Sequence, residues 1–439
     1  MLTAFARAFR TPDLRRKLLF TLFIIAVFRL GTNLPTPGIS EKAVTSCLNI
    51  ASHSGNASLF QLVNLFSGGG LFRLSVFALG IMPYITASII LQLLAVVIPR
   101  LETLRQEGPS GQAKITQYTR YLTVGLAILQ STGIVALARS GNLFGTTCNQ
   151  SLIPDATVFR IATMVIIMTA GTAVIMWLGE LITDRGVGNG MSLMIFTQVI
   201  AVVPGQLQLI YEEKRGFVLG VVVLVGVAII AFVAFMEQAQ RRIPVQYAKR
   251  MVGRRMYGGT STYIPLKVNQ AGVIPVIFGS SLLYIPQLAA QLFGGINTGH
   301  PKGWAVWIDN HLIIGDDPIY MLLYFVLILF FTYFYVSITF NPTEVADNMK
   351  KHGGFIPGIR PGRPTAEYLN YVLTRLTAPG SVYLGLVALI PMVAIALVGA
   401  TQQFPFGGTA ILIAVGVGLD TVKQIESQLQ QRNYEGFLR

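Results

Sequence analysis

Long apolar stretches alternate with shorter polar connections along almost the whole chain. A helix needs about 20 mostly apolar residues to cross the roughly 30 Å hydrocarbon core of a bilayer. The stretches that meet or approach this length are 18–34, 74–98, 121–137, 161–181, 191–210, 217–236, 268–293, 319–340, 381–398 and 406–419. The pattern predicts an all-α integral membrane protein of about ten transmembrane helices, with nine and eleven as the alternative counts.

Composition favours a membrane protein over a soluble one. Hydrophobic residues make up 53% of the chain and charged residues only 12%, whereas about a quarter of the residues in a typical soluble domain are charged. The first apolar stretch follows Arg15, Arg16 and Lys17 and contains no small-residue cleavage site. We therefore interpret it as a first span and not as a cleaved signal.

The Lys and Arg residues are divided unevenly between alternate connections. If the N-terminus lies in the cytosol, 25 of the 33 fall on the cytosolic side and seven on the external side, while Arg29 falls within the first span. Cytosolic loops of membrane proteins carry such an excess of positive charge. The distribution supports the span count and predicts that both termini are cytosolic.

Two long cytosolic loops, 237–267 and 341–380, carry seven and five of these basic residues. Within the first loop, the runs 243–247 and 260–266 are expected to pair as a β-hairpin. The basic charge is compatible with simple retention of the loops in the cytosol. Because the loops are longer than adjacent helices require, it is also compatible with binding to RNA or to an acidic protein surface.

Segment 57–73 is apolar at helical spacing but too short to cross a bilayer, and a Ser-Gly-Gly-Gly sequence at 67–70 interrupts it. One interpretation is an amphipathic helix that lies on the external membrane surface. The other is a re-entrant half-helix in a cavity, because broken backbone at membrane depth is tolerated where protein or water surrounds it.

The sequence offers no candidate catalytic, cofactor-binding or metal-binding residues, and we expect no enzymatic activity. A phosphate-binding Gly-x-x-x-x-Gly-Lys-Ser/Thr motif is absent. The histidines, His53, His300, His311 and His352, have no neighbouring His or Cys at ligand spacing. We expect all four to be solvated loop residues.

Ionisable residues are scarce within the predicted spans. Arg29 and Glu180 are the clear examples. A contact between them is possible, but we expect Glu180 to lie near the cytosolic end of its helix. Ion-coupled transporters keep ionisable groups within their spans, so this scarcity disfavours a secondary transporter of a small solute, the main alternative, and also a membrane-embedded hydrolase. Cys47 and Cys148 both fall on predicted external loops, where a disulfide and two separate thiols are both allowed.

Several stretches resemble the SecY family of protein-conducting channels: 66–90, 111–121, 185–190, 240–250, 265–275 and 355–365. The resemblance implies two pseudo-symmetric halves of five helices each, residues 1–215 and 216–439, that form an inverted repeat. It also implies that unfolded polypeptides cross the membrane through a pore between the halves, while apolar segments leave sideways into lipid.

The resemblance further implies roles for particular residues, assigned motif by motif. A ring of isoleucines would form the pore constriction: Ile81, Ile85, Ile195, Ile274, Ile277 and Ile413. Segment 57–73 would be a plug that includes Leu59, Phe60, Leu62, Val63, Phe66, Ser67, Gly68, Gly69 and Gly70. Polar positions of the lateral gate would be Ser88, Gln130 and Asn269, and cytosolic partner contacts would be Arg254, Arg255 and Arg360.

The partners implied by the resemblance are the SecE and SecG subunits, the SecA motor ATPase and the ribosome, whose rRNA and proteins would contact the basic loops. Signal peptides, unfolded client polypeptides and the lipid bilayer complete the set. The expected location is the bacterial cell membrane.

Overall fold

Helices make up most of the structure, a computed structural model that describes residues 9, 11–53, 67–139, 152–154, 157–247, 250–252, 255–257, 261–293, 302–308, 311–312, 317–398 and 408–435. The N-terminal part contains α2 (Pro12–Asn33), α3 (Glu41–His53), α5 (Met82–Val97), α6 (Pro99–Gln106), α7 (Pro109–Arg139), α8 (Val158–Arg185) and α9 (Gly190–Gln238). The C-terminal helices are α10 (Ile274–Phe293), α11 (Gly303–Ile308), α12 (Pro318–Thr339), α13 (Pro342–Lys351), α14 (Arg363–Val398) and α15 (Gly408–Glu435).

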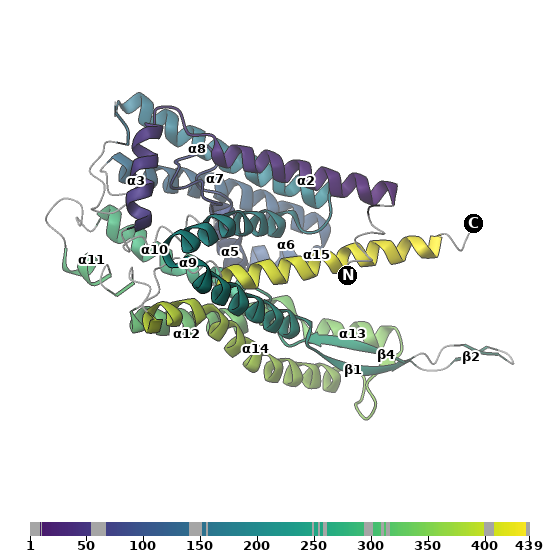
Figure 1. Cartoon of the computed structure of the whole chain (residues 1–439). Helices are drawn as coiled ribbons and strands as arrows, with labels where there is room; N and C mark the ends of the chain where they lie inside the picture. The colour runs from purple at the N-terminus through teal and green to yellow at the C-terminus, as the bar shows by residue number, and fades with distance from the viewer. Residues whose placement is uncertain are drawn as a thin grey trace.

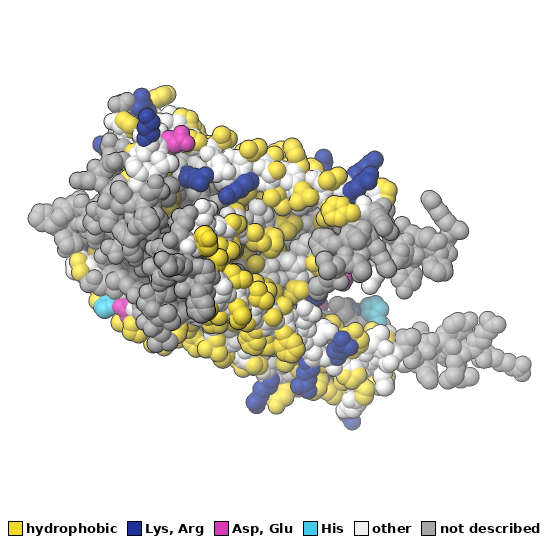
Figure 2. Space-filling view, in the orientation of Figure 1, with side chains coloured by type: hydrophobic (Ala, Val, Ile, Leu, Met, Phe, Trp, Pro, Cys, Tyr) yellow, Lys and Arg dark blue, Asp and Glu magenta, His cyan; other side chains and the backbone are white. Residues whose placement is uncertain are grey.

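The predicted spans fall on these helices. Six helical stretches of the described residues are long and apolar enough to cross a membrane, or seven if the bent pair α5–α6 counts as one span. Shorter apolar helices cover Gly190–Gly205 and Ile274–Leu283. Large apolar side chains are exposed on the outer helices, as a lipid-facing surface requires, and Figure 2 shows them across the middle of the visible face.

The second predicted span, 74–98, begins later than expected. Residues 67–81 form a series of turns, and α5 starts only at Met82. Gly80 has a positive φ of 57° and Pro83 lies at the start of α5, so the backbone is not helical before this point. At the other end, Ile98 is extended before Pro99, and α5 and α6 meet at a bend of 106°.

The connection predicted at 211–216 is also different, because α9 continues through it. Glu, Lys and Arg are good helix formers, and this connection contains no proline. Figure 1 shows α9 as two teal arms that meet at an angle. Other helices extend beyond the apolar stretches: α14 begins at Arg363 within the predicted loop 341–380, and α15 continues to Glu435.

The predicted hairpin is confirmed. Strands β1 (Gln240–Tyr247) and β4 (Ser261–Lys267) pair antiparallel, with Ile243 opposite Ile264. Two short strands, β2 (Arg250–Val252) and β3 (Arg255–Tyr257), pair farther along, and β5 (Gly354–Phe355) adds to the free edge of β1. Strands β1 and β4, the base of the hairpin, pack against α13 and α14 through a shared apolar core. The two basic loops therefore form one unit, here called the hairpin unit.

The elements divide between the two ends of the helix bundle. Figure 1 shows β1, β4, α13 and the C-terminal end of α15 at one end, and α3 and α11 at the other. The connections that we predict to be cytosolic thus gather at the hairpin end. Helices that are distant in the sequence also pack together within the bundle, for example α9 against α15.

Candidate pore and lateral gate

The six isoleucines of the predicted ring lie together in one apolar cluster, here called the isoleucine cluster. Five of them are buried and Ile274 packs at its edge as a partly buried member. They come from the starts of four helices, α5, α9, α10 and α15, and therefore from both predicted halves of the chain. A constriction of this apolar kind can block ions by excluding water, without any group that selects a substrate.

The motif at 185–190 positions one of these side chains. The Asn189 side chain accepts hydrogen bonds from the backbone N–H groups of Met191 and Ser192 and so caps the start of α9. At Gly190 an added Cβ would lie 1.8 Å from the Gly179 carbonyl oxygen. Only glycine permits this approach of α9 to α8, which places Ile195 in the cluster.

Residues 67–81, here called the link segment, are held between α2 and α8. Phe77 stacks on Phe28 of α2 with ring centroids 5.9 Å apart. An added Cβ at Gly31 of α2 would lie 2.1 Å from the Phe77 ring, and one at Gly171 of α8 would lie 2.1 Å from the Val76 carbonyl oxygen. Because these two glycines have no side chains, the link segment fits between α2 and α8 at this point.

The predicted plug is described only from its glycine-rich end. Leu59, Phe60, Leu62, Val63 and Phe66 lie outside the described residues. Ser67 to Gly70 form a turn in which the Ser67 hydroxyl accepts a hydrogen bond from the Leu71 N–H at 3.0 Å. Gly68 and Gly69 have φ values of 64° and 87°, a conformation that glycine adopts without strain.

Arg29 of α2 holds this turn. Its Nη1 donates a hydrogen bond to the Gly68 carbonyl at 2.8 Å, and Gly68 also lies against Gln198 of α9. The contact between Arg29 and Glu180 considered above is not formed. Glu180 instead accepts two hydrogen bonds of 2.8 Å from Arg120 of α7, a bidentate pair of the strong type.

The polar residues assigned to the lateral gate are not joined to one another by any hydrogen bond of the described residues. Ser88 of α5 accepts a bond from Gln92 on the same helix at 3.3 Å, and Gln130 lies on α7. Asn269, between β4 and α10, donates to the Glu237 carboxylate and to the Gly272 carbonyl. Both Asn269 and Glu237 are buried.

Apolar side chains of α5, α10 and α12 lie in one cluster, in which α10 packs against both α5 and α12. Ile89 of α5, Phe278 of α10 and Phe331 of α12 belong to the isoleucine cluster. The two phenylalanine rings meet edge to face with centroids 5.5 Å apart. We call this set of three side chains the seam; it is the part of the isoleucine cluster that α5, α10 and α12 share.

Two of the three predicted cytosolic contact residues lie in the hairpin unit. Arg255 begins β3, Arg360 is exposed between β5 and α14, and Arg254 lies outside the described residues. The Arg360 carbonyl accepts a hydrogen bond from Thr365 at 2.9 Å, which fixes the turn that carries it. The Arg242 guanidinium lies 4.8 Å from the centre of the Tyr263 ring on the paired strand, so a cation–π contact holds this basic side chain against the hairpin.

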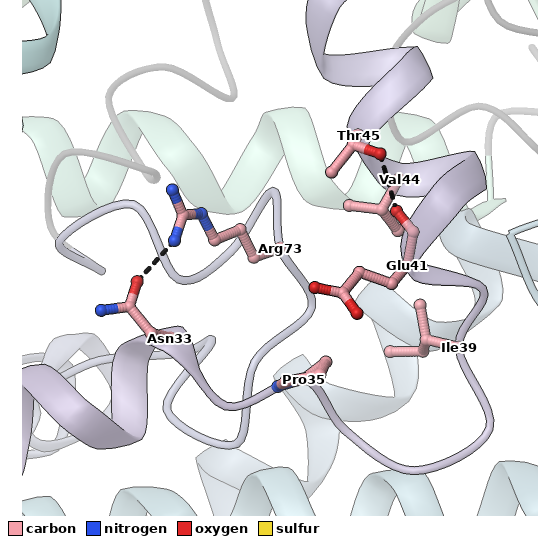
Figure 3. Close-up of a pocket in the computed structure, with 7 residues that line it drawn as sticks. All are labelled: Asn33, Pro35, Ile39, Glu41, Val44, Thr45 and Arg73. Carbon is pink, nitrogen blue, oxygen red and sulfur yellow. Dashed lines mark hydrogen bonds between the residues drawn. The ribbon is translucent and has the colours of Figure 1, made fainter.

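The opposite end of the bundle carries several fixed contacts. Cys47 of α3 is buried and disulfide-bonded; Cys148 lies outside the described residues. Arg73 of the link segment donates to Asn33 at the end of α2, beside a pocket that Glu41 also lines (Figure 3).

Two of the histidines expected to be solvated have protein partners. His311 is 2.8 Å from the Asp317 carboxylate at the start of α12, and His352 is 2.7 Å from the Asn348 carbonyl. The hydrogen bonds with His311 and with the Ile319 N–H hold the pKa of Asp317 below its usual range. These contacts fasten helix ends and bring together no set of catalytic groups.

Comparison with known proteins identifies relatives over the full length. The chain is 66% identical to the protein translocase subunit SecY of Streptomyces galbus and 59% identical to that of Mycobacterium tuberculosis H37Rv, and each alignment covers 100% of both chains. Among solved structures, one described as "The structure of a protein conducting channel" matches with a TM-score of 0.64 at 18% identity, over 94% of this chain and 91% of that one.

A second solved structure, of a SecY protein whose plug domain is described as stabilising the closed state, matches with a TM-score of 0.61 at 18% identity over 94% of this chain and 91% of that one. At these identities the two structures share the fold. The family model named SecY matches residues 75–422, which include all six isoleucines of the predicted ring. The chain belongs to the SecY family.

Proposed function

We propose that this chain is the pore-forming subunit of a protein translocase. Unfolded polypeptides pass through the isoleucine cluster, and apolar segments leave through the seam into lipid. The observation that carries the proposal is the meeting of six isoleucines from both predicted halves of the chain in one apolar cluster, in a chain of the SecY family. An apolar waist suits a cargo of varied chemistry because it offers no group that selects one sequence.

The proposed architecture has ten transmembrane helices in two halves, 1–215 and 216–439, related as an inverted repeat. The fifth and sixth spans are the two apolar stretches of α9, Gly190–Gly205 and Leu219–Gln238. The protein lies in the bacterial cell membrane, and both termini and the hairpin end face the cytosol, as the excess of Lys and Arg on that side supports.

In this proposal the chain supplies the path and its partners supply the driving force. The SecA motor or a translating ribosome docks on the hairpin unit, where Arg255 and Arg360 lie, and SecE and SecG accompany the channel in the membrane. The chain itself catalyses no reaction. A solved ribosome–channel complex, described as canine Sec61, matches this chain in fold with a TM-score of 0.61.

Release through the seam is a partitioning step. A segment of about 20 apolar residues is more stable in lipid than in water, whereas charged side chains are excluded. The side chains that form the seam, Ile89, Phe278 and Phe331, are all apolar. The alternative of a small-solute transporter gains no support from the relatives, which are named translocase subunits.

The proposal is tested by reconstitution. The purified chain, with SecE and SecG, is placed in vesicles, and SecA, ATP and an unfolded preprotein are added outside. Protection of the preprotein from protease, dependent on ATP and on this chain, is the expected result. Absence of protected preprotein in vesicles that contain the folded complex would contradict the proposal.

A further inference from the structure

The short helix α6 is fixed to the N-terminal part of the bundle. It follows α5 across the 106° bend and leads directly into α7. An added Cβ at Gly111 of α7 would lie 1.7 Å from the Leu104 carbonyl oxygen of α6. This close approach leaves α6 little freedom relative to α7, so α6 moves together with the α5 side of the seam.

One side chain of α6 reaches across the seam. Arg105 Nη2 donates a hydrogen bond of 2.6 Å to the carbonyl oxygen of Ile338, in the last turn of α12. These residues are 233 positions apart in the chain.

The sequence explains why this carbonyl needs an external donor. In a continuing helix, the Ile338 carbonyl would accept from the N–H four residues later. That position is Pro342, which has no N–H. The last carbonyls of a helix also carry partial negative charge, which favours a cation nearby. Arg105 therefore supplies both a donor and a positive charge to the end of α12.

We propose that Arg105 holds the lateral gate closed at the hairpin end of the bundle. The inference rests on the proposed function, since it assigns the seam as that gate. Apolar contacts such as Phe278 with Phe331 are non-directional, whereas the Arg105–Ile338 hydrogen bond exists only when α6 and α12 are together. An acidic side chain of a partner docked on this end would compete for Arg105, because a carboxylate is a stronger acceptor than a carbonyl, and would favour opening.

The test measures the distance between α6 and α12 directly. Spin labels are attached at T103C and T339C, two exposed positions on these helices, and the distance distribution is measured in the complex with SecE and SecG in nanodiscs. Arg105→Ala is compared with Arg105→Lys, which keeps a charged donor, and with Arg100→Ala, which removes the same charge from an exposed position of α6.

We expect Arg105→Ala to raise the separated fraction about fivefold, as the loss of one exposed, charge-assisted hydrogen bond allows. Arg105→Lys should restore much of the short distance, and Arg100→Ala should match the wild type. Arg105→Ala should also allow import of a preprotein whose apolar segment is too short for the wild type. An unchanged distance distribution in Arg105→Ala would overturn the inference, while wild-type import in the vesicle assay would leave the proposed function intact.

Discussion

The guanidinium of Arg29 donates a hydrogen bond to the carbonyl of Gly68 at 2.8 Å, across 39 positions of the chain. Gly68 also packs against Gln198, three residues after Ile195 of the isoleucine cluster. The turn that ends the predicted plug is thus fastened to α2 and lies beside α9 close to the proposed pore. Loss of this bond should free the plug without altering the pore itself.

Arg29→Ala should therefore increase the resting ion leak of the channel. A hydrogen bond to a charged group stabilises by about 1.5 kcal/mol, which corresponds to roughly a tenfold change in the population of the freed state. Single-channel conductance in planar bilayers measures the effect. Arg139→Ala removes the same charge from an exposed position at the end of α7, outside the predicted plug, and serves as the control. Equal leak in the two variants would show that the loss of positive charge, and not the loss of the bond to Gly68, causes the ion leak.

The isoleucine cluster should exclude water only while it stays apolar. Ile195→Asn should raise ion leak several-fold, because an amide side chain holds water in the constriction, while assembly with the partner subunits remains normal. Ile200→Asn on the same helix, at a position 42% exposed, is the matched control. Normal conductance of Ile195→Asn in planar bilayers would remove this residue from the pore.

Asn269 should stabilise the fold through Glu237. Asn269→Ala leaves a buried carboxylate without its side-chain donor and should lower the free energy of unfolding by about 1–3 kcal/mol. Glu237→Gln keeps an acceptor for Asn269 and should have a smaller effect. Thermal unfolding in detergent compares the variants. If Asn269→Ala melts at the wild-type temperature, the contact with Glu237 contributes nothing to stability.

Charge reversal at Arg360 should impair motor-driven import more than folding, because this exposed residue lies on the proposed docking surface. Import by SecA into vesicles is measured alongside the melting temperature. Arg363→Glu makes the same change of charge three residues away, at a side chain 91% exposed. This control variant should import the preprotein more efficiently than Arg360→Glu. Normal import by Arg360→Glu would show that this loop is dispensable for the motor.

Apolar pattern and motif could predict the helices, the hairpin and the membership of the isoleucine cluster. The pairing of the hairpin strands follows from two apolar runs on either side of glycines, and the isoleucines follow from motifs that resemble the SecY family. The partners of Arg29, Asn269 and Arg105 could not be predicted, because each contact depends on the packing of helices distant in sequence. The turns at 74–81 could not be predicted either, since hydropathy does not distinguish apolar turns from the start of an apolar helix.

The most direct measurement asks whether a client polypeptide touches the isoleucine cluster while it crosses. A photoreactive amino acid is placed at position 195 or 413, and at position 224 on the exposed face of α9 as a control. A preprotein is then arrested halfway through import and the sample is irradiated. We predict adducts between client and channel from positions 195 and 413 and none from 224. A trapped client that forms adducts at neither cluster position would contradict a path through this cluster.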